Sequence, residues 1–334
     1  MNLHEFLSEW NNSCDTITVH TSGSTGKPKL ICVEKRRMIA SARMTCSFLG
    51  LKPGDTTLLC MPLDYIAGKM VVVRSLVYNL KLISIKPSSH PLTTLTEPPV
   101  FAAMTPMQVY CSMQENKERE LLSKIKHLII GGGAIDEDLE AQLRTFPNAV
   151  WSTYGMTETL SHIALRRING KDADCWYTPF KDVNIHIASD NCLVIDAPMI
   201  CEKSLHTNDL AELADDGRRF RILGRKDNII DSGGIKINME AIENLLRPHI
   251  KTPFIITKRH DPRLGEAVTM LIEKEGANIN TIRNVCERVL PKYWHPQSYF
   301  TVTQIPTTET GKPARAEAIK LAHLAYTSKS ENTK

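Results

Sequence analysis

Residues 21–29, Thr-Ser-Gly-Ser-Thr-Gly-Lys-Pro-Lys, are the stretch that decides which fold we expect for this chain. The stretch combines hydroxyl side chains, glycines and two lysines, and contains no large apolar residue. Glycine lets backbone N–H groups approach an anion closely, while hydroxyl groups add donors and lysine adds positive charge. The composition therefore predicts a loop that binds a polyphosphate.

The segments on either side of this loop are typical of strands. Residues 16–19 and 30–33 are apolar or β-branched, as strands tend to be. The spacing differs from the Walker motif, in which Gly-Lys precedes Ser or Thr and then a helix, because Pro28 follows Lys27 here. We therefore expect a loop that joins two strands, with a solvated Ser/Gly-rich linker as the alternative.

Further motifs follow in the rest of the chain. They are Gly131-Gly132-Gly133-Ala134, Tyr154-Gly155-Met156-Thr157-Glu158, Thr207-Asn208-Asp209, Gly224-Arg225-Lys226-Asp227 and Thr310-Gly311-Lys312. Together with the loop, and in this order, they resemble the adenylate-forming superfamily, which includes acyl- and aryl-CoA ligases, nonribosomal adenylation domains and luciferases. The resemblance extends over nearly the whole chain.

Length and composition indicate an ordinary globular protein of two domains. The chain has 334 residues, of which 42% are apolar and 23% charged, and its net charge is +4. That charge is too small to argue for a nucleic acid or an anionic membrane as partner. The N-terminus lacks the basic and apolar regions of a signal peptide, so we expect a cytoplasmic protein. The nine cysteines show no zinc-site spacing and are expected to be reduced.

The first two thirds of the chain alternate between strand-like and helix-like segments. Strands are expected at residues 57–61, 81–85, 100–104 and 127–130. A helix over 34–49 should end at Gly50, and Thr105 should cap a helix that has Pro106 at its first position. This alternation predicts a large α/β domain with a mainly parallel sheet.

A second, smaller domain is expected beyond residue 227. The elements expected there are helices at 239–247 and 282–290 and strands at 254–257, 267–272 and 298–302. This pattern indicates a compact α+β domain of ordinary size. We therefore expect an adenylation domain at residues 1–226 and a mobile C-terminal lid domain at 228–334.

The chain departs from the superfamily at its N-terminus. Adenylate-forming enzymes usually have a long segment before the phosphate loop, whereas only twenty residues precede it here. We expect a minimal version with a shortened large domain, which Met1 favours; a fragment is the alternative.

The resemblance implies a role in ATP binding for several motifs. It assigns the β- and γ-phosphates to the loop residues Thr21, Ser22, Gly23, Ser24, Thr25, Gly26 and Lys29. Thr157 would bind the α-phosphate, and Glu158 would hold Mg²⁺ with a hard oxygen ligand. Both would therefore take part in catalysis.

The nucleoside is assigned to residues of other motifs. Asp209 would accept hydrogen bonds from both ribose hydroxyls, as a carboxylate does well. Gly132 and Gly133 would line the adenine slot, Tyr154 would stack on the base, and Arg225 would complete the ATP site. For a single Tyr or Asp outside such an ordered set, a packing or capping role is the alternative.

The resemblance also implies a catalytic lysine on a moving domain. Lys312 would stabilise the charge that develops as the acid attacks the α-phosphate. Because Lys312 and the phosphate loop belong to different domains, a hinge is required, and Asp227 matches the superfamily's hinge. The segment Ser232-Gly233-Gly234 would then contact coenzyme A, or else form a β-turn without a ligand.

The acid is the least defined substrate. In residues 62–68 Tyr65 stands where the superfamily commonly has histidine, so a role of that histidine does not carry over, and Tyr65 is itself a candidate for contact with the acid. The motifs look most like those of o-succinylbenzoate-CoA ligases of menaquinone biosynthesis, whose substrate keeps one of its two carboxylates. Lys69 and Arg74 are candidates for binding that carboxylate, with solvated helix charges as the alternative. His162 either contacts the acid or makes a core hydrogen bond.

The sequence therefore predicts an ATP-dependent acid:CoA ligase that forms an acyl-adenylate and then a CoA thioester. The substrates would be ATP with Mg²⁺, coenzyme A and a small carboxylic acid, with o-succinylbenzoate expected. The alternatives are a ligase for another aryl or acyl acid, an enzyme that loads a carrier protein, and a nucleotide-binding module without catalysis. No nucleic acid or membrane partner is expected, and a homo-oligomer remains open.

Overall fold

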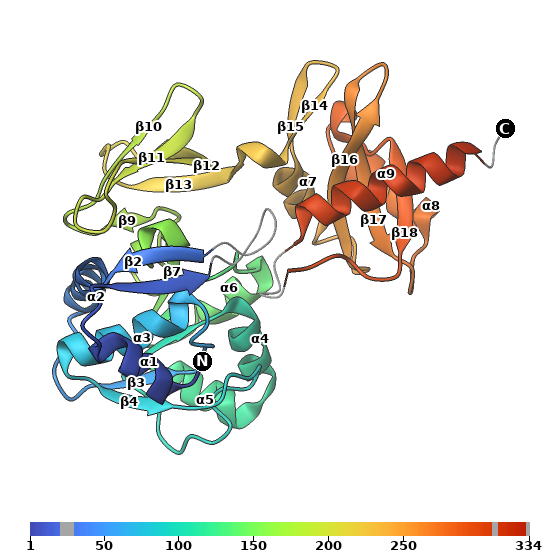
Figure 1. Cartoon of the computed structure of the whole chain (residues 1–334). Coiled ribbons are helices and arrows are strands. Elements are labelled where there is room, and N and C mark those ends of the chain that lie inside the picture. The colour runs from blue at the N-terminus through green and yellow to red at the C-terminus, as the bar shows by residue number, and fades with distance from the viewer. Residues whose placement is uncertain (21–29, 309–312, 332–334) are drawn as a thin grey trace. The chain divides into compact units, whose positions relative to one another are not determined.

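The computed structural model describes residues 1–20, 30–308 and 313–331 (Figure 1). The described chain folds into two compact units. The first contains residues up to Thr207 and also Ala211–Arg221, and the second contains Asn208–Leu210 and the residues from Ile222 onward. Each unit has its own sheet and its own core.

The largest sheet that the described residues form has seven strands in the order β4-β3-β5-β6-β7-β8-β9. These strands are β3 (Thr56–Leu59), β4 (Lys81–Ser84), β5 (Phe101–Met104), β6 (His127–Ile130), β7 (Ala149–Gly155), β8 (His162–Arg167) and β9 (Thr178–Pro179). The pairs from β4 to β7 are parallel, and only β8 and β9 join antiparallel. The expected α/β fold with a mainly parallel sheet is confirmed.

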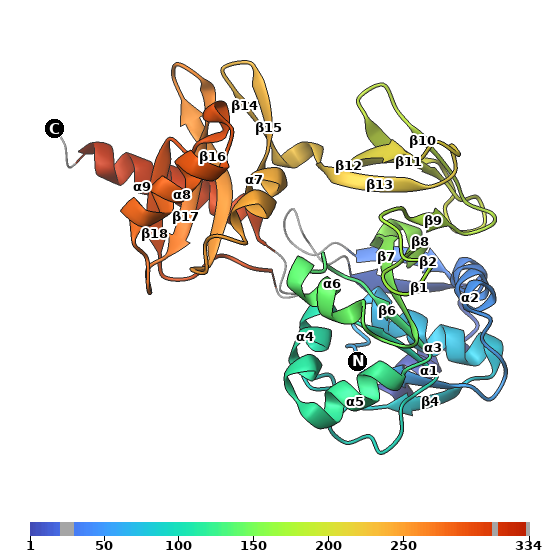
Figure 2. The ribbon, with the colours of Figure 1, turned by 180° about the vertical axis from the view of Figure 1, so that it is seen from behind.

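Helices cover both faces of this sheet (Figure 1, Figure 2). The helices α4 (Pro106–Gln114), α5 (Asn116–Lys124) and α6 (Glu137–Leu143) pack on one face, where alternate strand residues such as Leu58, Met104 and Ile130 are buried. On the other face lie α2 (Lys35–Leu49) and α3 (Ile66–Tyr78), and Phe48 packs edge-on against Trp151 with 5.3 Å between the ring centroids. Alternation along each strand thus supplies two apolar faces.

Local capping fixes helix ends as the sequence predicts. Thr105 and Gln108 form a reciprocal capping box at the start of α4, with Pro106 at the first helical position. The helix α2 ends at Leu49, and Gly50 follows in the left-handed conformation. The start of α4 and the end of α2 therefore lie where the sequence predicts them.

Smaller elements complete the first unit. The strands β1 (Thr16–His20) and β2 (Leu30–Glu34) pair antiparallel, which confirms the two strands expected on either side of the phosphate loop. The helix α1 (Leu3–Asn11) precedes them. A further sheet has the order β10-β11-β12-β13, and the division between the units falls within β12 and β13. Its strands are β10 (Asn184–Ile187), β11 (Cys192–Asp196), β12 (Leu205–Leu213) and β13 (Phe220–Arg225).

The second unit is an α+β structure around the central strand β17. Its sheet has the order β15-β14-β17-β16, with β18 on β17. The strands are β14 (Ile229–Ser232), β15 (Ile235–Asn238), β16 (Phe254–Asp261), β17 (Gly265–Glu273) and β18 (Ser298–Val302). The helices α7 (Met239–Leu246) and α8 (Ile279–Val289) share one core with the sheet, and α9 (Arg315–Glu331) packs on its other face.

Several of the expected elements are longer than the sequence indicates, among them β16 and α8. The strand β16 continues to Asp261 because it pairs with β17 as far as Gly265. The helix α8 begins at Ile279 because Asn278 caps it by accepting a hydrogen bond from the Thr281 amide. Among the residues described, no helix has the length and apolarity needed to cross a membrane.

Candidate active site

Several residues with predicted roles lie outside the described part of the chain. These are the phosphate-loop residues Thr21, Ser22, Gly23, Ser24, Thr25, Gly26 and Lys29, and the lysine Lys312. Their roles therefore stay predictions. The remaining residues fall into a group in the first unit and a group in the second.

Two motifs of the first group lie at the carboxyl ends of the parallel strands. Gly132 and Gly133 follow β6, which lies between β5 and β7. The Gly131 amide donates to the Met104 carbonyl at 3.0 Å, which ties the turn after β6 to the end of β5. The motif from Tyr154 to Glu158 follows from the end of β7. Ligands of open α/β sheets bind at the carboxyl ends of the strands, so this edge suits a nucleotide site.

Tyr154 belongs to a cluster of aromatic rings. Its ring centroid lies 5.1 Å from that of Phe220, edge-on, and 5.8 Å from that of Tyr177. The Tyr177 hydroxyl in turn lies 2.8 Å from the hydroxyl of Ser152 on β7. Packing therefore fixes the ring of Tyr154, and its stacking on adenine stays a prediction.

A short 3-10 helix, η1 (Thr157–Thr159), carries the residues predicted to bind phosphate and Mg²⁺. The turn is held by Thr159, which accepts from the Met156 amide at 2.9 Å and donates to the Ser161 carbonyl at 2.7 Å. Glu158 is exposed. Leu160 adopts φ +62°, a costly conformation for a bulky residue, so the chain is strained directly after this motif.

Gly155 permits the close approach of β7 to β8. A side chain on Gly155 would place its Cβ 2.3 Å from the Ser161 carbonyl oxygen and 2.4 Å from the His162 Cα. The strand register shifts between Tyr154 and Gly155, where Gly155 pairs with His162. Glycine is therefore needed here to bring Ser161 and His162 next to the nucleotide motif.

Four side chains beside this motif form a chain of hydrogen bonds, in which Arg74, His162 and Thr45 are buried and Ser161 is partly exposed. Arg74 donates from Nη2 to the Ser161 hydroxyl at 2.6 Å, and that hydroxyl lies 3.2 Å from His162 Nδ1. His162 Nε2 lies 3.1 Å from the Thr45 hydroxyl, which donates to the Ser41 carbonyl at 3.2 Å. Burial, and then the charge of Arg74, hold the pKa of His162 well below its usual value. Burial also lowers the pKa of Arg74 to about 10.

Lys69 and Arg74 are both buried in α3 but point to different neighbours. Lys69 is 2% exposed, and its ammonium lies 3.5 Å from the Glu9 carboxylate and 5.2 Å from the centroid of the Phe6 ring. Arg74 is also 2% exposed but contacts Ser161 instead. Neither is the solvated helix charge that was the alternative. Tyr65 lies at the N-cap of the same helix and is partly exposed.

The sequence did not single out Thr45 or Ser161 as site residues. Ser161 directly precedes His162, so its position in the motif was a usable signal. Thr45 is 117 residues from His162 in the chain, and nothing in the apolar pattern of its helix indicates the contact. Only the packing of α2 against β8 reveals it.

In the second unit Arg225 brings together two residues with predicted roles. Its Nη1 donates to Asp209 at 3.1 Å and its Nη2 to Asp227 at 3.0 Å. The Asn208 amide also donates to Asp227, at 3.1 Å. Asp209 is buried, whereas Asp227 is exposed. The motifs at 207–209 and 224–227 thus form one polar cluster.

The segment Ser232-Gly233-Gly234 forms the turn of a β-hairpin. Ser232 of β14 pairs with Ile235 of β15, so Gly233 and Gly234 are the two turn residues. Their φ values, +61° and +84°, are those a tight two-residue hairpin requires and glycine adopts readily. The turn alone accounts for the two glycines, and contact with coenzyme A stays a prediction.

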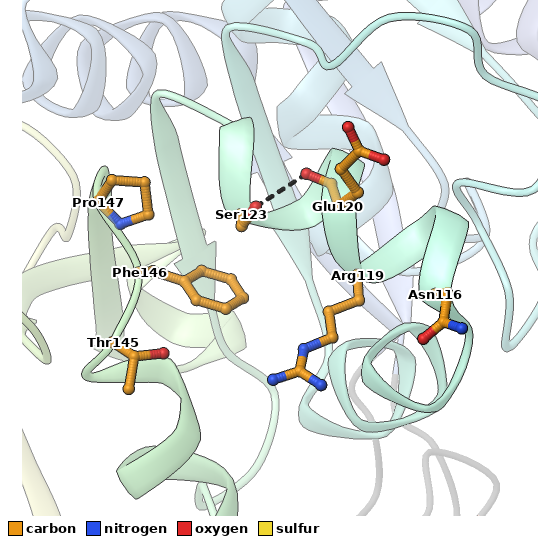
Figure 3. A pocket seen from close by; sticks show the side chains of 7 residues that line it. All are labelled: Asn116, Arg119, Glu120, Ser123, Thr145, Phe146 and Pro147. Atoms are coloured by element: carbon orange, nitrogen blue, oxygen red, sulfur yellow. Dashed lines mark hydrogen bonds between the residues drawn. The ribbon is translucent and has the colours of Figure 1, made fainter.

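One surface pocket of about 390 Å³ lies at the opposite edge of the large sheet (Figure 3). It is lined by Asn116, Arg119, Glu120, Ser123, Thr145, Phe146 and Pro147. The lining residues of α5 precede β6, and the others precede β7, so they lie at the amino ends of these strands. The Ser123 hydroxyl donates to the Glu120 carbonyl at 2.8 Å. This pocket contains none of the predicted site residues.

Comparison with known proteins identifies the family. The family model of AMP-binding enzymes matches residues 9–194. The 2-succinylbenzoate–CoA ligase of Listeria monocytogenes is 25% identical over 92% of this chain and 70% of its own length. The enzyme of the same name from Bacillus cytotoxicus is 24% identical over 91% of this chain and 69% of its own length.

Solved structures show the same fold. An acyl-CoA synthetase (AMP-forming)/AMP-acid ligase II-like protein from Dyadobacter fermentans has a TM-score of 0.64 and 29% identity, with 94% of this chain and 93% of that chain covered. O-succinylbenzoate coenzyme A synthetase from Bacillus subtilis, in complex with ATP and magnesium ion, has a TM-score of 0.75 and 20% identity. The match covers 90% of this chain and 69% of that one. With its fold, its ordered motifs and a family match over more than half its length, this chain belongs to the AMP-binding enzyme family of adenylate-forming ligases.

Proposed function

We propose that this protein is an ATP-dependent acid:CoA ligase whose acid is o-succinylbenzoate. In the first half reaction a carboxylate oxygen of the acid bonds to the α-phosphorus of ATP while the bond to pyrophosphate breaks. In the second the coenzyme A thiol attacks the acyl carbon, loses its proton, and AMP leaves. The names and coverage of the relatives from Listeria and Bacillus support this choice of acid.

The choice of acid rests on the environment of Arg74. Its guanidinium is buried, and its Nε has no hydrogen-bond partner among the described residues. Within the described residues, no carboxylate lies within ion-pair distance of Arg74. A buried cation without an anion is costly, and a carboxylate of the ligand would supply the missing partner. A substrate that keeps a second carboxylate after activation fits this requirement.

Lys69 is the weaker candidate for the same role. Its ammonium already has an anion in Glu9, and it lies beside the ring of Phe6 in α1. Its charge is therefore satisfied within the protein. We assign Lys69 to the attachment of α1 to α3 and Arg74 to the acid.

Metal binding is proposed for Glu158. Magnesium keeps several waters and is bound by one or two carboxylates together with substrate phosphates, so a single exposed carboxylate is a suitable donor set. When bound, Mg²⁺ would neutralise charge on the phosphates of ATP. Thr157, adjacent in η1, would donate its hydroxyl to the α-phosphate, and Asp209 would hold the ribose. These assignments follow from the motif order.

The proposal is tested with purified protein, ATP, Mg²⁺ and a panel of carboxylic acids. We expect acid-dependent exchange of pyrophosphate into ATP, and consumption of free coenzyme A with o-succinylbenzoate. Adenylation without consumption of coenzyme A would indicate a carrier-loading enzyme. Preference for another acid would overturn the substrate, and absence of exchange with every acid would indicate a nucleotide-binding module.

A further inference from the structure

The hydrogen-bond chain next to η1 has one direction in which every hydroxyl hydrogen finds an acceptor within the chain. Arginine has no acceptor, so the Ser161 oxygen accepts from Arg74 Nη2, at 2.6 Å. The hydrogen of the Ser161 hydroxyl is then available to His162 Nδ1, at 3.2 Å. Nδ1 can accept only if it carries no proton, which places the proton of the neutral ring on Nε2.

The far end of the chain agrees with this assignment. His162 Nε2–H donates to the Thr45 hydroxyl oxygen at 3.1 Å. The hydroxyl hydrogen of Thr45 goes to the Ser41 carbonyl at 3.2 Å. Every hydrogen between Arg74 and Ser41 thereby has an acceptor. In the opposite tautomer His162 Nδ1–H would donate to the Ser161 oxygen and the Thr45 hydroxyl would donate to Nε2. The Ser161 hydrogen would then have no acceptor in the relay, and the Ser41 carbonyl would lose the Thr45 donor.

We propose that Ser161, His162 and Thr45 form a directed relay that orients the Arg74 guanidinium toward a carboxylate of the substrate. Thr45 and His162 are positioning residues in this assignment, because they act on the acid only through Ser161 and Arg74. The inference rests on the proposed function, and it names the residues that determine specificity for a dicarboxylate.

Two features of the site explain why a relay is needed. The relay contains no anion, so it holds Arg74 without neutralising its charge, whereas a carboxylate in the place of Ser161 would do so. The relay also fixes one N–H of the guanidinium, while Nε has no partner in the part of the chain that the structure describes. A carboxylate is best bound by a guanidinium that is already oriented, because two donors can then reach it together.

The test uses substitutions that change the relay and keep its shape. Thr45→Val removes the hydroxyl at nearly constant volume, and Thr45→Ser keeps it. The chain supplies a matched control in Thr57, a buried threonine whose hydroxyl has no hydrogen-bond partner within residues 1–20, 30–308 and 313–331. Each variant is assayed with o-succinylbenzoate and with a monocarboxylate analogue in which hydrogen replaces the carboxylate that is not activated.

We expect Thr45→Val to lower the preference for the dicarboxylate, measured as the ratio of the two kcat/KM values, by about tenfold, mainly through KM. Thr45→Ser should restore the preference, and Thr57→Val should leave it as in the wild type. Equal losses on both acids, or no loss, would overturn the relay.

A second measurement reads the relay directly and does not depend on the acid. The ¹⁵N shifts of the histidine rings, with the His162 signals identified by a His162→Gln variant, should show a proton on Nε2 and none on Nδ1. A proton on Nδ1 in the wild type would overturn the direction of the relay. If the tautomer is as expected but the wild type does not convert o-succinylbenzoate, the proposed substrate is overturned instead.

Discussion

The guanidinium of Arg225 donates a hydrogen bond of 3.0 Å to the carboxylate of Asp227. Its other terminal nitrogen donates to Asp209 at 3.1 Å. The residue predicted to act as the hinge and the residue predicted to bind ribose thus share one arginine. A substitution at Asp227 changes both the backbone and this contact, so the two effects have to be separated.

A proline at the predicted hinge should block only the second half reaction. Asp227→Pro fixes φ near −65° and removes the carboxylate, whereas Asp227→Ala removes the carboxylate alone. We expect Asp227→Pro to form acyl-adenylate and fail to transfer it to coenzyme A, and Asp227→Ala to retain transfer. The two half reactions are measured separately, and unimpaired overall turnover of Asp227→Pro would rule out the hinge.

Replacement of Lys312 should affect the two half reactions unequally. Lys312→Ala removes the ammonium that would stabilise charge during attack on the α-phosphorus, so acyl-adenylate formation should be abolished. Thioester formation from supplied acyl-adenylate should be much less affected. Equal loss in both assays would contradict a role confined to adenylation.

The two buried cations of α3 should behave differently. Arg74→Ala should lower kcat/KM for the dicarboxylate by about tenfold to several hundredfold and affect the monocarboxylate analogue much less, because the retained carboxylate loses its partner. Lys69→Ala should leave the ratio of the two kcat/KM values unchanged. It removes the ion pair with Glu9 and should therefore weaken the attachment of α1 to α3. A variant of Arg74 that loses the same factor on both acids would show that Arg74 does not bind the retained carboxylate.

Stability should fall at acidic pH through His162. Burial lowers the pKa of His162 in the folded state, whereas the unfolded chain binds a proton near pH 6.5. Below that pH the unfolded state carries the extra proton, so the free energy of unfolding falls by up to about 1.4 kcal/mol per pH unit from this group. Urea unfolding at pH 7.5 and 5.5 should therefore show a larger decrease for the wild type than for His162→Gln. Parallel decreases would contradict a neutral, buried His162.

The buried pair of Glu243 and Arg315 should dominate the stability of the second unit. Glu243 is 3% exposed, and Arg315 donates to its two oxygens at 2.6 and 2.7 Å. Glu243→Ala should cost about 3–5 kcal/mol, because it leaves a buried guanidinium unpaired. Amide hydrogen exchange in β16 measures this loss of stability, because exchange becomes faster as the unit becomes less stable. Glu317→Ala breaks the exposed pair with Lys320 and should change stability by less than about 1 kcal/mol.

Much of the fold was predictable because its signals are local. Short strand-like runs that alternate with helix-like segments predict β3, β5 and β6, and the cap at Thr105 predicts the start of α4. The lengths of β16 and α8 were not predictable from alternation, since hairpin pairing and the Asn278 cap determine them. The motifs also identified candidates for ATP binding, because their residue types and order are legible without a structure.

The sequence alone determined the family, the order of the motifs predicted to bind phosphate, adenine and ribose, and the presence of two basic side chains in α3. Tertiary structure decided which of those two cations has an internal anion, because α1 brings Glu9 to Lys69 and β8 brings Ser161 to Arg74. It also decided that His162 bonds Thr45, 117 residues away. Burial arises only when distant segments pack together, and it leaves the Nε donor of Arg74 without a partner among the residues described.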